Sequence, residues 1–297
     1  MQSEQLDAQR DEAEAGPGVS RGLRYMATGA FFFSVMSLLV KLAGQTLPSQ
    51  EIVFARSLVM TVLSFLLLKR LGMALLGTRR RLLVVRGLLG FAALSCFYYA
   101  IVHLPLADAT VIQYTNPAFA AVFAVFVLGE RMRRREVVCV MLSLIGVLLV
   151  AQPGFLFGSD SGLDPTAAGV ALLGAVLSAA AYVTVRQLAA EHHLVVIFYF
   201  AVISTLGAVP GTLLNPVLPN ARELLLLLGV GVMTHLGQVY MTRGLHLERA
   251  GRATATALVQ IVFAGVWGAI FFSQIPGPLG MIGAALVVAG VLLLGRS

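Results

Sequence analysis

Residues 109–130 are ATVIQYTNPAFAAVFAVFVLGE, and residues 253–274 are ATATALVQIVFAGVWGAIFFSQ. Each stretch is largely apolar over the roughly 20 residues that a helix needs to cross the hydrocarbon of a membrane. The two stretches align without gaps at an offset of 144 residues, so that Asn116 meets Gln260. We call this spacing the repeat offset. The pair of stretches predicts a membrane protein whose two halves are related.

The composition of the whole chain supports a membrane protein. Apolar residues make up 58% of the 297 residues, charged residues only 12%, and the mean hydropathy is +0.89. A water-soluble protein of this size needs far more charged residues on its surface, so most of this surface must face lipid. The 21 Lys and Arg residues lie in short loops between apolar segments. Because that distribution is typical of topology signals, we expect contact with membrane lipid and no nucleic-acid partner.

The chain divides into a tail and two halves. Residues 1–22 include five acidic residues and a Gly-Pro-Gly run, which predicts a disordered cytoplasmic tail. Residues 23–152 and 166–295 form the two predicted repeats. They contain ten apolar segments with approximate cores at 24–43, 50–68, 83–102, 106–128, 136–151, 167–189, 194–214, 222–242, 250–272 and 277–295. The sequence therefore predicts an all-α integral membrane protein with ten transmembrane helices.

The positive charges predict the orientation. With the N-terminus inside, 18 of the 21 Lys and Arg residues fall on the cytoplasmic side or its helix flanks, and we assign Arg86 to such a flank. Only Lys41 and Arg222 fall outside, and Arg56 lies within the second helix. Positively charged loops stay in the cytoplasm, so we expect a multi-pass inner-membrane protein with both termini cytoplasmic.

The odd number of helices in each half has a mechanistic consequence. A second half of five helices enters the membrane from the opposite side to the first, so the predicted duplication is inverted. Inverted repeats have two nearly equivalent packings around a site near the midplane, one open to each side. This arrangement favours a carrier over a channel, a receptor or an anchor.

Three motifs give the chain a family resemblance. They are EIVFARS at residues 51–57, YAIVHLPLADAT at 99–110 and LGER at 128–131. With them the chain resembles the drug/metabolite transporter superfamily, and within it the ten-helix EamA-type carriers. The second half departs from the family pattern, because Gln274 stands where such proteins usually have Glu and the turn at residues 247–252 is basic.

The resemblance implies alternating access by two five-helix bundles around a central cavity formed by helices 1, 3, 4, 6, 8 and 9. It implies small-molecule substrates such as amino acids, nucleotide-like compounds, vitamins and drugs, with no cofactor. Export is expected by analogy with the majority of similar carriers. An uptake carrier for a nucleotide- or vitamin-like compound is the alternative within transport.

Polar side chains at membrane depth are costly unless they face protein or water, so each is a candidate site residue. The predicted substrate-binding residues are Ser34, Tyr98, Tyr99, Gln113, Tyr114, Asn116, Tyr182, His235, Gln238, Gln260 and Trp267. Aromatic faces with scattered amides and hydroxyls suit a planar or amphipathic solute.

Structural explanations compete with a role in binding. Pro117 can kink its helix while Gln113 bonds to a neighbouring helix instead of a ligand. His235 can be a neutral donor to a nearby carbonyl. The aromatic residues near the outer interface, such as Trp267, can belong to an interfacial belt.

Charged residues limit the mechanism. Arg56 lies about 10 Å along its helix from the outer end and is predicted to be a gate or structural charge. No Asp or Glu lies in the middle of a predicted span, so we expect neither a carboxylate proton relay nor a polycation substrate.

The alternatives from another class are a non-transport receptor and an intramembrane enzyme. The sequence shows no nucleophile with its base and no metal-ligand spacing at one depth, so we expect neither catalytic residues nor a metal site. Gly280, Gly283 and Gly290 would permit close packing by the last helix, including packing in a homodimer.

Overall fold

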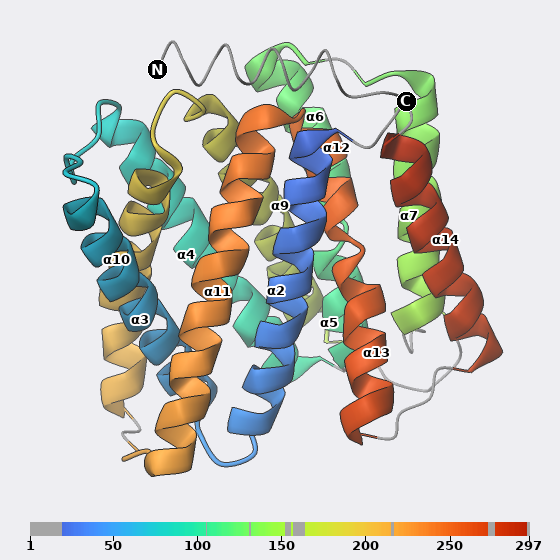
Figure 1. Ribbon diagram of the computed structural model, residues 1–297. Helices are drawn as coiled ribbons and strands as arrows, with labels where there is room; N and C mark the ends of the chain where they lie inside the picture. Colours follow the sequence, from blue (N-terminus) through green and yellow to red (C-terminus); the bar gives the residue numbers. More distant parts are fainter. Residues whose placement is uncertain are drawn as a thin grey trace.

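The computed structural model describes residues 20–104, 106–130, 132–151, 156, 164–214, 217–272 and 277–295. These residues form helices and no strands (Figure 1). Of the predicted cytoplasmic tail, residues 1–19 lie outside the described residues, and residues 21 and 22 already belong to the first helix.

The helices lie within a few residues of the predicted segments. Their bounds are α2 Arg21–Ala43, α3 Ser49–Arg70, α4 Arg80–His103, α5 Leu106–Gln113, α6 Asn116–Leu128, α7 Arg134–Ala151, α9 Pro165–Gln187, α10 His193–Leu214, α11 Ala221–Leu247, α12 Ala250–Ala257, α13 Gln260–Phe272 and α14 Pro278–Gly295. Two predicted segments are interrupted by a break: the segment 106–128 is divided into α5 and α6, and the segment 250–272 into α12 and α13, although each contains one stretch long and apolar enough to cross a membrane.

Local capping explains where several helices begin. At the start of α11, the side chain of Asn220 accepts a hydrogen bond from the backbone of Glu223, and the side chain of Glu223 accepts one from the backbone of Asn220. The carboxylate of Asp164 accepts the backbone N–H of Thr166 at the start of α9. Such caps satisfy N–H groups that have no partner inside the helix.

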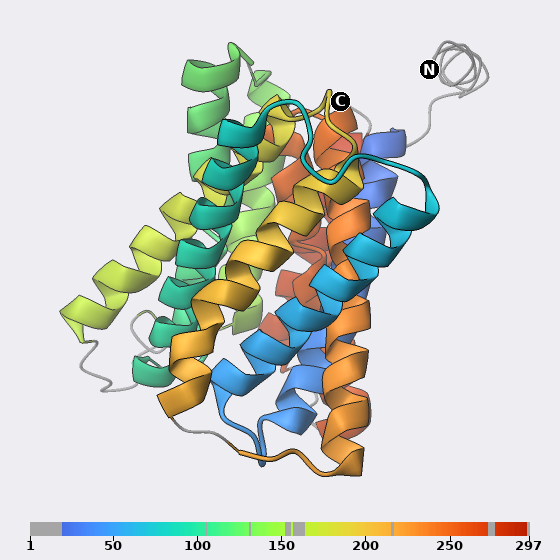
Figure 2. The same cartoon turned by 90° about the vertical axis from the view of Figure 1, so that its left-hand side faces the viewer.

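The helices pack in a bundle with a regular set of neighbours. Helix α2 packs along α11, and α4 packs along α9. Helices α3 and α10 lie side by side (Figure 2), and α7 and α14 form a separate pair at one edge of the bundle (Figure 1). The broken segments α5–α6 and α12–α13 lie between these pairs, with α12 packed against α6. The breaks therefore lie inside the bundle.

Much of the outer surface is apolar. Large side chains such as Phe126, Val138, Leu206 and Ile270 are more than half exposed. Among the described residues, eight segments are long and apolar enough to cross a membrane, while α14 is apolar but shorter. Helix α7 is not one of the eight because its 18 residues include charges in the first turn. The chain is a multi-pass membrane protein.

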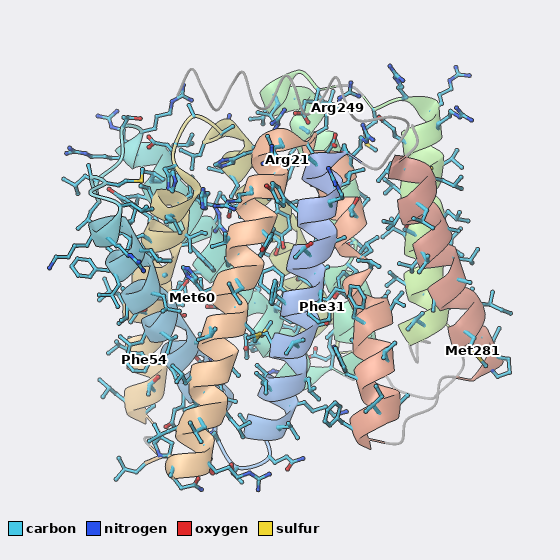
Figure 3. The ribbon with its side chains drawn as sticks, viewed as in Figure 1. Arg21, Phe31, Phe54, Met60, Arg249 and Met281 are labelled. Carbon is cyan, nitrogen blue, oxygen red and sulfur yellow. The ribbon has the colours of Figure 1, made fainter. Side chains whose placement is uncertain are left out.

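The two ends of the bundle differ in charge. Arg21 and Arg249 lie at one end, and Met281 lies toward the other (Figure 3). We call the first of these the Arg21 end. Helices α4 and α7 also begin with basic residues at this end (Figure 1), in agreement with the charge asymmetry predicted from the sequence.

Candidate functional site

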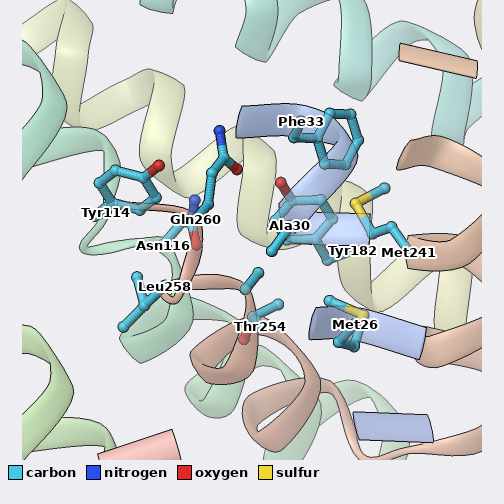
Figure 4. Close-up of a pocket in the computed structure, with 11 residues that line it drawn as sticks. Met26, Ala30, Phe33, Tyr114, Asn116, Tyr182, Met241, Thr254, Leu258 and Gln260 are labelled. Atoms are coloured by element: carbon cyan, nitrogen blue, oxygen red, sulfur yellow. The ribbon is translucent and has the colours of Figure 1, made fainter. Parts of the chain in front are cut away.

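A small cavity lies inside the bundle where several helices meet. Its volume is about 50 Å³. It is lined by Met26, Ala30, Phe33, Tyr114, Asn116, Tyr182, Met241, Thr254, Ala257, Leu258 and Gln260 (Figure 4). Sites for drug-sized ligands typically measure about 300–1,000 Å³. In this conformation the cavity has room for water and must widen to accept an organic solute.

The two helix breaks both face this cavity. The first separates α5 from α6 at residues 114–115, and the second separates α12 from α13 at residues 258–259. Tyr114 and Asn116 line the cavity from the first break, and Leu258 and Gln260 line it from the second. The breaks are separated by the repeat offset, the spacing found between the two halves of the sequence.

Backbone geometry explains the first break. Pro117 lies in the first turn of α6, where its missing N–H costs nothing, so the proline starts a new helix instead of continuing α5. The backbone N–H of Thr115 bonds to Ile112 three residues earlier, and the Thr115 hydroxyl donates to the same carbonyl. These short bonds tighten the end of α5.

The second break occurs without a proline. The hydroxyls of Thr254 and Thr256 donate to the carbonyls four residues before them, at Ala250 and Arg252. Such back-bonding bends helices. The N–H groups of Leu258, Val259, Ile261 and Val262 then bond three residues back instead of four. The threonine pattern is a sequence signal for this break that we did not use.

The breaks place helix ends against the cavity. Asn116 is the first residue of α6 and Gln260 is the first residue of α13. A helix N-terminus presents unpaired N–H groups and a partial positive charge, which favour an anionic or electron-rich group nearby.

Four of the predicted substrate-binding residues line the cavity: Tyr114, Asn116, Tyr182 and Gln260. Another, Gln113, forms a hydrogen bond to a neighbouring helix. Its amide donates to the Ser178 hydroxyl at 2.9 Å, while its buried oxygen Oε1 has no partner among the described residues. The structural explanation therefore holds for one end of the Gln113 amide and leaves the other end free.

Ser34 and Trp267 contact each other. The indole Nε1 of Trp267 donates to the hydroxyl of Ser34 at 3.0 Å and joins α13 to α2. Ser34 is fully buried, and Trp267 also packs against Phe31 with ring centroids 6.2 Å apart. This pair lies outside the cavity lining and fixes the position of α13.

Four predicted residues lie away from the cavity lining. Tyr99 is 39% exposed and stacks on His103, and Tyr98 contacts Phe97. The ring nitrogen Nδ1 of His235 lies 3.4 Å from the hydroxyl of Ser64 on α3, and its Nε2 has no partner among the described residues. Gln238 is buried with its Oε1 also unpartnered. Both His235 and Gln238 are buried, and the sequence did not reveal which neighbours they face.

Arg56 is buried in α3, with 6% of the residue exposed, and its Nε has no partner among the described residues. The Oε2 of buried Glu51 also has no partner there. These two atoms therefore form no hydrogen bond with each other. Residues 51 and 56 are five positions apart, whereas side chains that meet on one helix are three or four positions apart.

Arg86 is the main residue that sequence reasoning missed. We assigned it to a cytoplasmic flank, but only 3% of the residue is exposed and its guanidinium lies over the ring of Phe200, 4.5 Å from the centroid. The sequence signal for this burial was the position of Arg86 within α4. It lies six residues after the first residue of α4, about as deep as Arg56 lies from the end of its own helix.

A network of charges closes the Arg21 end above the cavity. The carboxylate of Glu130 accepts hydrogen bonds at 3.0 Å from Nε of Arg186 on α9 and from the backbone N–H of Ala250 at the start of α12. Arg186 also donates to the carbonyl of His246 on α11. Because Thr254 in the cavity wall lies one turn from Ala250, these contacts lie directly above the cavity.

Glu136 extends this network. It is 1% exposed and lies 3.5 Å from Arg249 and 3.7 Å from Arg252. Arg252 also pairs with Glu248 at 3.4 Å, and Glu248 accepts a hydrogen bond of 2.6 Å from Ser20. We call these contacts the charge network; its acidic and basic members are Glu130, Glu136, Arg186, Glu248, Arg249 and Arg252. It joins the first half of the chain to the second.

The glycines of α14 pack within the chain. A Cβ added at Gly283 would lie 2.6 Å from the carbonyl of Gly146 on α7, and one added at Gly290 would lie 2.9 Å from the carbonyl of Cys139. These two glycines therefore support the pair α7–α14. Over the described residues, no group of three His, Cys, Asp or Glu side chains is arranged to hold a metal ion.

Comparison with known proteins gives this architecture a family. A model of the EamA-like transporter family matches residues 20–152 and again residues 166–296. The pseudopaline exporter CntI of Pseudomonas aeruginosa (strain UCBPP-PA14) is 40% identical over 278 residues, which cover 93% of this chain and 96% of the relative. Human solute carrier family 35 member G1 is 32% identical over 299 aligned residues, covering 94% of this chain and 81% of the relative.

A solved crystal structure shares the fold. It matches with a TM-score of 0.79 at 18% identity and covers 92% of this chain and 95% of that chain. The double family match, the relatives named as transporters and the apolar helical bundle agree with one another. This chain belongs to the EamA-like transporter family and is a membrane transporter.

Proposed function

We propose that this chain is a secondary transporter that exports a small organic metabolite, amino-acid-like, nucleotide-like or drug-like, across the inner membrane by alternating access. The observation that carries the proposal is the cavity at two helix breaks that are separated by the repeat offset. In transporters with inverted repeats, discontinuous helices form the substrate site near the midplane.

Helix packing supports an inverted repeat. The repeat offset relates α2 to α9 and α4 to α11, so the contact of α2 with α11 corresponds to the contact of α9 with α4. In the same way, the contact of α3 with α11 corresponds to that of α10 with α4. The repeat offset relates α3 to α10 and α7 to α14, so in each of these two pairs a helix packs against its own equivalent. Such contacts are expected for elements that lie across a twofold axis.

Individual contacts follow the same offset. The hydroxyls of Thr61 and Thr205, which are 144 residues apart, lie 3.1 Å from each other. A residue and its own equivalent can touch only near a twofold axis. On α4, a Cβ at Gly87 would collide with Ile203, and on α11 a Cβ at Gly231 would collide with Val59. The repeat offset relates Gly87 to Gly231 and Val59 to Ile203, so these two contacts are equivalent.

Ten crossings and two cytoplasmic termini complete the proposal. Helix α7 pairs with α14 along its length, so we assign the two shorter helices as the fifth and tenth crossings. The repeats then correspond to residues 23–152 and 166–295. The Arg21 end faces the cytoplasm, because positive loops are retained on that side.

In this scheme the charge network is the closed cytoplasmic gate. Export requires the network to open so that substrate reaches the cavity from the cytoplasm, and to close again before release outside. The small size of the cavity agrees with a conformation in which the cytoplasmic entrance is shut. Breaking the contacts of Glu130 frees α12 and α9 to move apart.

We assign substrate contacts to the cavity residues Tyr114, Asn116, Tyr182 and Gln260, and to the free amide oxygen of Gln113. Ser34 and Trp267 position α13 against α2. The pseudopaline exporters among the relatives support the outward direction and suggest pseudopaline as one solute to test.

An efflux assay tests the proposal. Cells that overproduce the protein are loaded with pseudopaline, amino acids, nucleosides and aromatic drugs, and the initial rate of loss is compared with that of cells lacking it. We expect accelerated loss of at least one solute and a rate about tenfold lower for Asn116→Ala or Gln260→Ala, since one lost hydrogen bond of about 1.4 kcal/mol changes affinity tenfold.

The matched control is Gln187→Ala, which removes an amide at the end of α9, away from the cavity lining, and is expected to leave the rate unchanged. Loss of no solute above background, or equal rates in the cavity variants and the wild type, would contradict the proposed function or its site. Accumulation instead of loss would identify an uptake carrier.

A further inference from the structure

Arg86 is a buried cation with unsatisfied hydrogen-bonding groups. Its Nε and Nη1 have no partner among the described residues, and none of the ion pairs formed by those residues includes it. A guanidinium offers five N–H donors and stays charged at any physiological pH. A charged side chain within a transmembrane segment is expensive and almost always has a partner or a function.

The surroundings of Arg86 connect it to the cavity. Phe200 covers one face of the guanidinium, and Nη1 extends along α4 toward Gly90. On the side of α9, Tyr182 packs against the apolar cluster that includes Leu83, which lies one turn before Arg86 on α4. Tyr114 belongs to the break between α5 and α6. Both tyrosines line the cavity, where their rings lie on either side of Gln260 (Figure 4). Tyr182 therefore connects the cavity lining with the part of α4 that holds Arg86.

Packing alone does not account for this arginine. At the position one repeat offset later, α11 has Val230, which is fully buried at the corresponding interface with α3. The residue one repeat offset before Phe200 is Arg56, so the corresponding interface also has a buried arginine, on α3 instead of α11. Replacing a buried charge by a well-packed apolar residue is often neutral or stabilising, so an unpaired arginine at this depth needs a reason other than stability.

We propose that Arg86 is the anion-recognition residue of the transport site, and that the substrate has a carboxylate which binds between the guanidinium and the hydroxyl of Tyr182. This inference rests on the proposed function and names the chemical class of its substrate. A carboxylate matches the fork of N–H groups on a guanidinium and supplies the missing counter-charge. The N-termini of α6 and α13 favour the same negative group.

Matched acids and amides test the proposal by thermal denaturation of the protein in detergent. The probes are benzoate against benzamide and succinate against succinamide, with ionic strength held constant by chloride. We expect the acids to raise the melting temperature of the wild type and the amides to leave it unchanged. The shift should be lost in Arg86→Met and partly kept in Arg86→Lys, whereas Arg81→Met, at the exposed start of α4, should behave as the wild type.

The same variants without ligand distinguish recognition from structure. Arg86→Met should melt at or above the temperature of the wild type, because it removes an unpaired buried charge. A markedly lower melting temperature would assign Arg86 to packing and overturn the proposal. So would acid shifts that survive in Arg86→Met, equal shifts from acids and amides, or no shift from either acid in the wild type.

Efflux measurements on these variants separate this proposal from the proposed function. If the wild type exports a solute and Arg86→Met exports it equally fast, anion recognition by Arg86 is wrong while the transport function stands. If the wild type exports nothing, the function fails whatever the melting temperatures show.

Discussion

Buried polar residues in this protein differ in whether their hydrogen bonds are complete. Glu191, in the turn between α9 and α10, accepts the backbone N–H groups of Thr78 at 2.8 Å and Arg79 at 2.5 Å, as well as the hydroxyl of Thr78. Arg86 and the oxygen of Gln113 have unsatisfied atoms. The satisfied carboxylate holds two loops together, whereas Arg86 and Gln113 keep hydrogen-bonding atoms that a ligand can satisfy.

Glu191→Gln is expected to destabilise the protein in a manner that depends on pH. Burial alone raises the pKa of Glu191, but the hydrogen bonds from Thr78 and Arg79 and the charge of Arg79 outweigh it, and the pKa lies below the ordinary 4.5. The carboxylate therefore stabilises the fold fully above about pH 4.5, and this contribution is lost as the pH falls through the lowered pKa.

Melting temperatures in detergent measure this effect. We expect the wild type to exceed Glu191→Gln by about 2–6 °C at pH 7, which corresponds to about 1–2 kcal/mol. The difference should shrink as the pH falls below 4.5. A difference that stays constant down to pH 3.5 would mean that the charge of Glu191 is not what holds the loops.

At the scale of helices, small residues decide how closely elements approach. A Cβ on Gly146 of α7 would lie 2.6 Å from the carbonyl of Gly283 and 2.8 Å from the backbone nitrogen of Val287, both on α14. Backbone atoms cannot move aside as flexible side chains do. The pair α7–α14 therefore depends on glycine, which is the usual device for close packing of helices in membranes.

Gly146→Ala should force α7 away from α14 and destabilise the protein by about 1–3 kcal/mol, the usual cost of overpacking. Gly265→Ala is the control within another transmembrane helix, because no atom lies within 4 Å of its added Cβ. This control should be neutral or stabilising by up to about 1 kcal/mol, since alanine is the better helix former. Melting temperatures of the two variants would be compared, and equal values would contradict the close contact.

At the scale of the whole molecule, the two halves of the chain differ in the charged residues available to join them. The charge network holds the Arg21 end, where Glu130 of the first half bonds to α9 and α12 of the second. The residue one repeat offset later is Gln274, which cannot carry the same charge. In the proposed inverted repeat, different gates at the two ends would favour one conformation over the other without any change in the core.

Under the proposed function, Glu130→Gln weakens the cytoplasmic gate and increases access to the cavity from the Arg21 end. Ala257, in the cavity wall, would be replaced by cysteine in a protein lacking Cys96 and Cys139, and labelled with a water-soluble maleimide in inside-out vesicles. Losing about 1–1.4 kcal/mol of gate stability should raise the labelling rate about five- to tenfold.

Glu223→Gln serves as the control for this measurement, because it removes a carboxylate that caps α11 at the opposite end of the bundle. It should leave the labelling rate unchanged. Labelling that stays slow in Glu130→Gln would show that the charge network does not limit access.

The sequence by itself determined the membrane class, the positions of the helices and the family, because these depend on apolar length, charge distribution and local motifs. It also identified Tyr114, Asn116, Tyr182 and Gln260 as polar residues at membrane depth. Only the tertiary structure separated these cavity residues from His235 and Gln238, because helical spacing specifies a face and not the neighbour which that face meets.

The break between α12 and α13 and the burial of Arg86 were also decided by the tertiary structure. Backbone bends produced by threonine hydroxyls depend on weak bonds whose effect varies with packing. An arginine near a helix end can reach water or turn inward, and the sequence is the same in both cases. For Arg86, the ring of Phe200 on α10 packs over the guanidinium in the inward position.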